Sequence, residues 1–102
     1  MQQLANGIEV LSEHAVVTIA KQFSESQFLA SAQQFVKQQQ WQQAFVEQGA
    51  DWQVLGFYIE QQLWWFRYDA LSQGAWFECA NSEHFHTSSA PLLAALNHAS
   101  FD

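Results

Sequence analysis

The side chains most able to do chemistry gather near the end of the chain, where Cys79 is followed by Glu83, His84 and His86. If this segment is extended, His84 and His86 share a face, because residues two apart in a strand project to the same side. Two imidazoles so placed can bind zinc or another borderline metal. Further ligands would have to come from Glu83, Cys79, His14 or His98. The sequence offers no second pair of ligands, so we expect surface residues between a strand and a helix, and no bound metal.

Cys79 is the only cysteine, so no intramolecular disulfide can form, which is typical of a reducing compartment. A catalytic thiolate needs a general base within hydrogen-bonding reach and a site for an oxyanion. Strand alternation instead places Cys79 on the same face as Ala75 and Phe77, and free cysteine is among the most buried residue types. We therefore expect a core cysteine in a protein that is not an enzyme and needs no cofactor. An enzyme built on Cys79 and a histidine is the alternative.

Other catalytic patterns are missing from the sequence. The four glycines are never clustered as a phosphate-binding loop requires. Four carboxylates lie in or just after the predicted meander: Glu60, Asp69, Glu78 and Glu83. They fall at predicted loops and strand ends, so we expect a solvated rim rather than an acid–base pair in a cleft.

Aromatic residues are concentrated in the same half. Nine of them lie between positions 52 and 77: Trp52, Phe57, Tyr58, Trp64, Trp65, Phe66, Tyr68, Trp76 and Phe77. About half must fill a core, but one layer of helices covers only one face of a sheet. Tryptophan and tyrosine are enriched anchors of protein interfaces. The aromatic residues that the core cannot hold therefore predict a protein interface or a small apolar pocket.

The charge balance excludes several partners. Ten acidic residues face only three basic ones, Lys21, Lys37 and Arg67, and the formal net charge is -7. Phosphate contacts need cations, so neither nucleic acid nor an anionic membrane surface is an expected partner. The first seven residues do not resemble a secretion signal, and no apolar stretch approaches the ~20 residues that span a bilayer. We expect a cytoplasmic protein.

The first half of the chain predicts a hairpin and helices. Residues 8–11 and 15–20 form two short strands in this prediction, joined by a turn at 12–14. Ser24 followed three residues later by Gln27 matches a capping box. Apolar residues then follow at helical spacing: Phe28, Ala32, Phe35 and Val36. Trp41 and Phe45 would fall on the opposite side of the same helix, so we predict a bend near position 39 and a second short helix ending at Gly49.

The second half predicts an antiparallel meander of three strands, over residues 51–60, 63–68 and 75–80. Gly56 in the middle of the first strand indicates a bulge or a closely packed neighbour. Residues 81–87 should be irregular or extend the last strand. A final helix should then begin at Ser88 or Ser89, with Pro91 in its first turn, where a missing N–H costs nothing.

Together these elements predict one α+β domain over residues 1–102, in the order ββα(α)βββα. Its antiparallel five-stranded sheet should carry helices packed mainly on one face. In the strand 63–68, Arg67 marks its side as the one facing solvent, since a lone arginine is seldom fully buried. Trp65 shares that side, while Trp64 and Phe66 lie on the other.

Association is therefore the leading functional hypothesis. An exposed patch of several rings exceeds what monomers usually leave uncovered. We expect a protein partner or self-association as a homodimer, with Trp65 central and Arg67 at the edge of the patch. The candidate interface residues are Trp65, Arg67, Trp52, Tyr58 and Trp76. The alternative is a metal- or small-ligand-binding protein that uses residues 83–86 or an aromatic pocket.

The charge balance makes the first testable prediction. Fluorescence anisotropy titrations at physiological salt should detect no sub-micromolar binding of DNA or RNA, because three bases cannot replace the counterions of a row of phosphates. Sub-micromolar affinity for either polymer would contradict the exclusion of nucleic acid.

Overall fold

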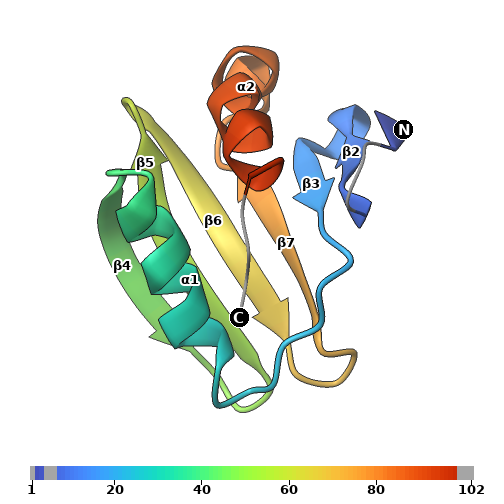
Figure 1. Ribbon diagram of the computed structural model, residues 1–102, viewed down its shortest axis with the longest axis vertical. Helices are drawn as coiled ribbons and strands as arrows, with labels where there is room; N and C mark the ends of the chain where they lie inside the picture. Colours follow the sequence, from blue (N-terminus) through green and yellow to red (C-terminus); the bar gives the residue numbers. More distant parts are fainter. Residues whose placement is uncertain (1, 4–6, 99–102) are drawn as a thin grey trace.

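The computed structural model of the protein describes residues 2–3 and 7–98, and within them seven strands form one sheet. The strands are β1 (Gln2–Gln3), β2 (Glu9–Leu11), β3 (Val16–Thr18), β4 (Gln42–Gln48), β5 (Trp52–Ile59), β6 (Gln62–Asp69) and β7 (Gly74–Cys79). The helices are α1 (Phe28–Gln38) and α2 (Phe85–Leu96), with short 3-10 turns η2 (Ser12–His14) and η3 (Ser82–His84). Figure 1 shows their arrangement. The predicted α+β class is confirmed, but the sheet has seven strands instead of the predicted five, because β1 pairs with β2 and β4 stands where a helix was predicted.

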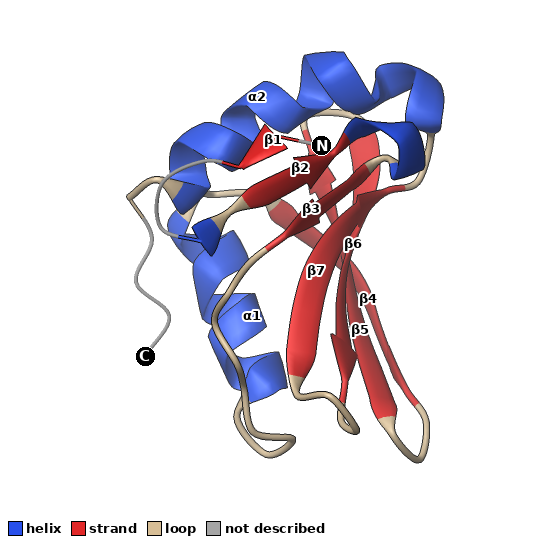
Figure 2. Ribbon diagram, turned by 90° about the vertical axis from the view of Figure 1, so that its right-hand side faces the viewer, coloured by secondary structure: helices blue, strands red, loops and turns tan. Residues whose placement is uncertain are grey.

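The sheet is antiparallel throughout, in the order β1-β2-β3-β7-β6-β5-β4. The predicted hairpin is β2 and β3, and the predicted meander is β5, β6 and β7. Both helices lie on the same side of the sheet, and the opposite side of β4 to β7 has no helix over it (Figure 2). This confirms helices on one face.

The core lies between α1 and the inner face of the meander. The Phe66 and Phe77 rings stack at 3.9 Å between centroids, and Phe28 of α1 meets Phe66 edge-on at 4.9 Å. Phe28 also stacks on Tyr68, whose buried hydroxyl donates a 2.8 Å hydrogen bond to the Phe23 carbonyl. Burial, with the negative charges of two nearby carboxylates, raises the pKa of Tyr68. A buried phenol needs this partner, because an unpaired polar group would lose its bonds to water.

The predicted second helix is wrong, because residues 42–48 form the edge strand β4. Gln40 has a left-handed φ of 64°, which ends the helical path and reverses the chain after α1. Val46 then pairs with Leu55, and Phe45 with Gly56. Trp41 stacks on Phe57 at 5.7 Å on the core side. Pairing with β5 outweighs the helical propensity of the glutamines and alanine, as tertiary contacts commonly do.

The predicted helix starts also need correction. No side chain caps α1, and the Ser24 hydroxyl lies 3.4 Å from that of Ser26 instead of bonding the first turn. Helix α2 begins at Phe85, earlier than the predicted start at Ser88 or Ser89, because η3 leads directly into it. Asn81 starts this turn by accepting a 3.0 Å hydrogen bond from the Glu83 amide. Pro91 therefore lies inside the helix rather than in its first turn.

Gly56 allows the Phe45 ring to pack closely against the backbone of β5. A closely packed neighbour is one of the two features that a glycine in mid-strand predicts. The Phe45 ring from β4 lies over Gly56, and a Cβ built on Gly56 would overlap that ring. The register of β4 shifts between Gln43 and Phe45, next to this contact. An aromatic side chain thus covers the backbone that the glycine leaves bare.

A double-mutant cycle tests this contact. Gly56→Ala should lower the free energy of unfolding by about 1 kcal/mol, because the Phe45 ring must move. In a Phe45→Ala background the same change should cost nothing or stabilise, since alanine loses less backbone entropy than glycine. Urea unfolding followed by tryptophan fluorescence measures both. Equal costs in the two backgrounds would show that the ring does not require the glycine.

Candidate functional site

The side of the sheet opposite the helices, which we call the outer face, carries all five predicted interface residues. Trp52 and Tyr58 lie on β5, Trp65 and Arg67 on β6, and Trp76 on β7. The pairing places Arg67 between Val54 and Trp76, and Trp65 between Gly56 and Glu78. Trp64, on the other side of β6, is 0% exposed beneath the helices. The predicted facing of β6 is therefore correct.

A charged pair covers the centre of the outer face. Arg67 Nε lies 3.1 Å from Glu78 Oε1, and both side chains are about one-third exposed, at 34% and 30%. The Arg67 guanidinium also sits over the Trp65 ring, 4.7 Å from its centre, in a cation–π contact. Trp65 is central as predicted, but Arg67 lies above it rather than at the edge of a patch. The centre is thus an electrically balanced surface of arginine, glutamate and indole.

The exposed rings lie toward the two ends of the outer face. Trp52 is 42% exposed and Tyr58 is 37% exposed. They stand at opposite ends of β5, because β5 runs from residue 52 to residue 59. Within the described part of the chain, the other large apolar side chain this exposed is Leu71, in the β6–β7 turn. The apolar surface is therefore two exposed rings with half-buried ones between them, not a continuous bare patch.

A hollow of about 270 Å³ lies beside Trp52 on the outer face. Trp76, Val54, Arg67 and Asp69 share its lining. Hydrogen bonds from the side chain and the amide of Ser72, the latter 3.1 Å long, lower the pKa of Asp69. An ionised carboxylate and two indoles thus surround a recess large enough for one side chain of a partner.

The structure separates the predicted metal ligands. Residues two apart on helical backbone point roughly 200° apart, so His84 and His86 do not share a side. The irregular or strand-extending segment predicted for residues 81–87 is wrong, because η3 and the start of α2 occupy it. His84 Nδ1 instead lies 2.7 Å from Gln62 Oε1. Across residues 7–98 no three His, Cys, Asp or Glu side chains come together as metal ligands would.

The other candidates for chemistry also lie apart. Glu60 and Asp69 stand at opposite ends of β6, and Glu78 is held by Arg67. Cys79 is 5% exposed, and its thiol donates a 3.1 Å hydrogen bond to the Asn81 carbonyl. The prediction of a core cysteine is confirmed.

One candidate site escaped sequence reasoning. A cleft of about 580 Å³ opens between the β5–β6 turn and α2, with Glu60, Gln62 and His84 in its lining. Its polar groups come from two segments, the β5–β6 turn and the start of α2, and Gln62 and His84 lie 22 positions apart. Its rim depends on a helix start that the sequence does not reveal. The only feature of the sequence that pointed to this cleft was His84, which belongs to the candidate ligand-binding segment 83–86.

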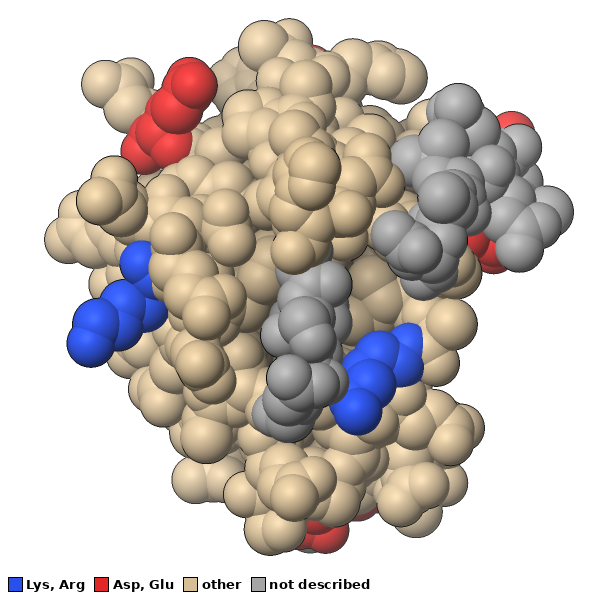
Figure 3. All heavy atoms as spheres, viewed as in Figure 1, with Lys and Arg blue, Asp and Glu red and all other residues tan. Residues whose placement is uncertain are grey.

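Comparisons of the chain with protein-family models, curated proteins and solved structures found no match. No helix among the described residues is long and apolar enough to cross a membrane. The charged side chains on the helix-bearing face are few and scattered (Figure 3), with no cluster of bases. The site must therefore be interpreted from its own geometry.

The burial of Cys79 makes a direct prediction. A thiol reagent should modify it at least about tenfold more slowly in the native protein than in urea, because labelling must wait for local opening. Mass spectrometry of quenched samples measures both rates. Similar rates in the two states would show an accessible thiol and revive the alternative of a reactive cysteine.

Proposed function

We propose that this chain is a protein-association domain that forms a homodimer through the outer face of its sheet. The observation that carries the proposal is the exposure of Trp52 and Tyr58 on a sheet face that neither helix covers. The exposed part of a large apolar ring gains nothing from folding, and a partner surface that covered it would add that burial free energy. No catalytic arrangement competes for this surface, and we propose no enzymatic activity.

The dimensions of the outer face suit a second copy. Four strands, β4 to β7, lie about 4.8 Å apart and together span about 14 Å, and strands of six to eight residues run about 20 to 27 Å. The flat footprint of about 350 Å², before side-chain relief is counted, is of the same order as the roughly 800 Å² that each partner buries in a standard interface.

The charge distribution also permits self-association. The Arg67–Glu78 pair leaves the centre of the outer face neutral, so two centres can meet without repulsion. The other acids of the outer face lie at its rim: Glu47 on the edge strand β4, beside Val54, and Asp69 and Glu60 near its two ends. With a net charge of -7 on each copy, the long-range repulsion should be screened by salt. A homodimer should therefore tighten as salt rises, whereas a complex with a basic partner should weaken.

We also propose that the protein is cytoplasmic. Its support is the single free cysteine, Cys79, whose thiol is buried and unpaired with any other cysteine. Nucleic acid and membrane surfaces are not proposed as partners, because the three bases are too few to attract them.

Sedimentation analysis tests the homodimer. At tens of micromolar the protein should sediment as a dimer, and Trp52→Ser or Trp65→Ala should raise the dissociation constant about thirtyfold or more, as truncation of an interface tryptophan commonly does. Leu71→Ser is the matched control, since Leu71 is 81% exposed but lies in the β6–β7 turn. It should leave the dimer unchanged.

Two results would contradict the proposal. A monomer at every concentration and salt tested would exclude the homodimer. A dimer that both tryptophan variants leave intact would place the interface elsewhere. Tyrosine and tryptophan near-ultraviolet circular dichroism of each variant shows whether the fold is retained.

A further inference from the structure

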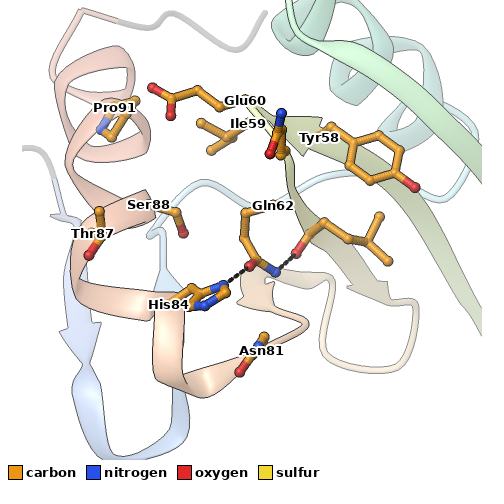
Figure 4. Close-up of a pocket in the computed structure, with 11 residues that line it drawn as sticks. Tyr58, Ile59, Glu60, Gln62, Asn81, His84, Thr87, Ser88 and Pro91 are labelled. Atoms are coloured by element: carbon orange, nitrogen blue, oxygen red, sulfur yellow. Dashed lines mark hydrogen bonds between the residues drawn. The ribbon is translucent and has the colours of Figure 1, made fainter.

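A second surface, separate from the centre of the outer face, is the cleft between the β5–β6 turn and α2. It encloses about 580 Å³, a size typical of small-molecule sites. Figure 4 shows Glu60 reaching from the turn toward Pro91 of α2, with Gln62 and His84 meeting on the other side of the opening. Ser88 lies between them on the helix. Polar groups from two distant segments thus converge on one opening.

The tautomer of His84 follows from its partners. Gln62 Nε2 donates a 3.0 Å hydrogen bond to the Leu63 carbonyl, which can only accept. The Gln62 amide oxygen must then face His84, where it lies 2.7 Å from Nδ1. His84 Nδ1 therefore carries the proton, and Nε2 is the acceptor of the neutral ring. The two hydrogen bonds, from Gln62 to the Leu63 carbonyl and from His84 to Gln62, hold the imidazole in place and leave Nε2 free to accept.

Pro91 removes one hydrogen bond from α2. It lies inside α2 and has no N–H, so it cannot bond the carbonyl of Thr87, four residues earlier. Thr87 and Pro91 both line the cleft. The proline that looked like a helix-start residue in the sequence thus leaves the Thr87 carbonyl without its usual helical partner.

Glu60 supplies the negative charge. Its φ of 57° is left-handed, a conformation that favours glycine or asparagine and costs a glutamate energy. Among the described residues that line the cleft there is no lysine or arginine. The only formal charge in the lining, with histidine neutral, is therefore a carboxylate.

The start of α2 does not turn the cleft into an anion site. The η3 turn precedes the helix, and the Phe85 amide already donates to the Ser82 carbonyl. The Glu83 amide donates to Asn81, and the Glu83 carboxylate stands in the first turn of η3. The positive end of the helix dipole is thus already balanced by an acid.

We propose that this cleft binds a small organic cation, a protonated amine attached to an apolar body. The Glu60 carboxylate would hold the ammonium group, and His84 Nε2 and the Thr87 carbonyl would accept N–H bonds. Ile59, Leu63 and Pro91 would pack against the apolar body. The cleft shares Tyr58 with the outer face, but this proposal rests on Glu60, His84 and Thr87, which belong to the β5–β6 turn, to η3 and to α2.

Trp64 provides a built-in reporter of binding. Its indole N–H donates a 3.0 Å hydrogen bond to the hydroxyl of Ser88, which lines the cleft. The indole resonance of Trp64 in a ¹⁵N-correlation spectrum should therefore move when a ligand settles against Ser88. The resonance of Trp52, on the outer face, should stay in place.

Three probes of one shape separate charge from apolar contact: benzylammonium, benzyl alcohol and benzoate. Benzylammonium should shift the Trp64 resonance saturably, at least about fivefold more tightly than benzyl alcohol, and benzoate should not bind. Glu60→Gln should remove that preference. Glu25→Gln is the matched control, because it deletes the same charge near Tyr68, at the other end of β6, and it should change nothing.

Glu60→Gly separates binding from folding. It removes the carboxylate and also the strain of the left-handed backbone, so it should be at least as stable as the parent while losing benzylammonium binding. His84→Ala should weaken binding about threefold.

Several results would overturn the proposal. They are equal affinity for the three probes, unchanged binding in Glu60→Gln, no shift of Trp64 at 20 mM benzylammonium, or a shift of Trp52 in place of Trp64. The first would mean apolar contact alone, and the last would mean binding on the outer face. None of these results bears on sedimentation, so failure here leaves the homodimer to its own test.

Discussion

The packing of aromatic rings between α1 and the inner face of the meander is the interaction on which the rest of the structure depends. Phe66 and Phe77 stack across neighbouring strands, and Phe28 closes over them from the helix. These rings fix the facing of β6 and β7, because a one-residue slip would move every inward ring to water. The outer face is therefore set by the core: once Trp64 is buried, Trp65 and Arg67 must point the other way.

Because both helices lie on one side of the sheet, the side chains of the outer face must be shielded from water by one another. With no helix above it, the sheet protects its own rings by local contacts. Arg67 lies over Trp65 and is held by Glu78, and Phe45 lies over the bare backbone of Gly56. What these contacts cannot cover, Trp52 and Tyr58, remains in water at the ends of β5. The outer face is thus intermediate between an apolar core and an ordinary polar surface, and for this reason we propose association as its role.

The cleft beside α2 arises from a different constraint, the way the chain passes from β7 into the helix. Asn81 starts η3, the helix begins early, and Pro91 consequently falls in its interior. The same early start carries His84 to Gln62 on the neighbouring turn. The early start of α2 therefore brings the acceptors of the cleft together. It also separates the two histidines, which would have shared a face in an extended segment.

The sequence by itself determined the α+β class, the meander, the inward facing of Trp64 and Phe66 and the burial of Cys79. The class rests on helical spacing and strand alternation, and the others on alternation alone, local rules that side-chain burial enforces. The sequence also named Trp52, Tyr58, Trp65, Arg67 and Trp76 as interface candidates, but only the register of strand pairing shows that all five share one face. Only the tertiary structure decided that residues 42–48 are a strand, since pairing with β5 outweighs a helical composition. It alone decided that Glu78 pairs with Arg67 and that Gln62 meets His84, because such contacts join residues far apart in the chain, and no local pattern specifies the distance between them.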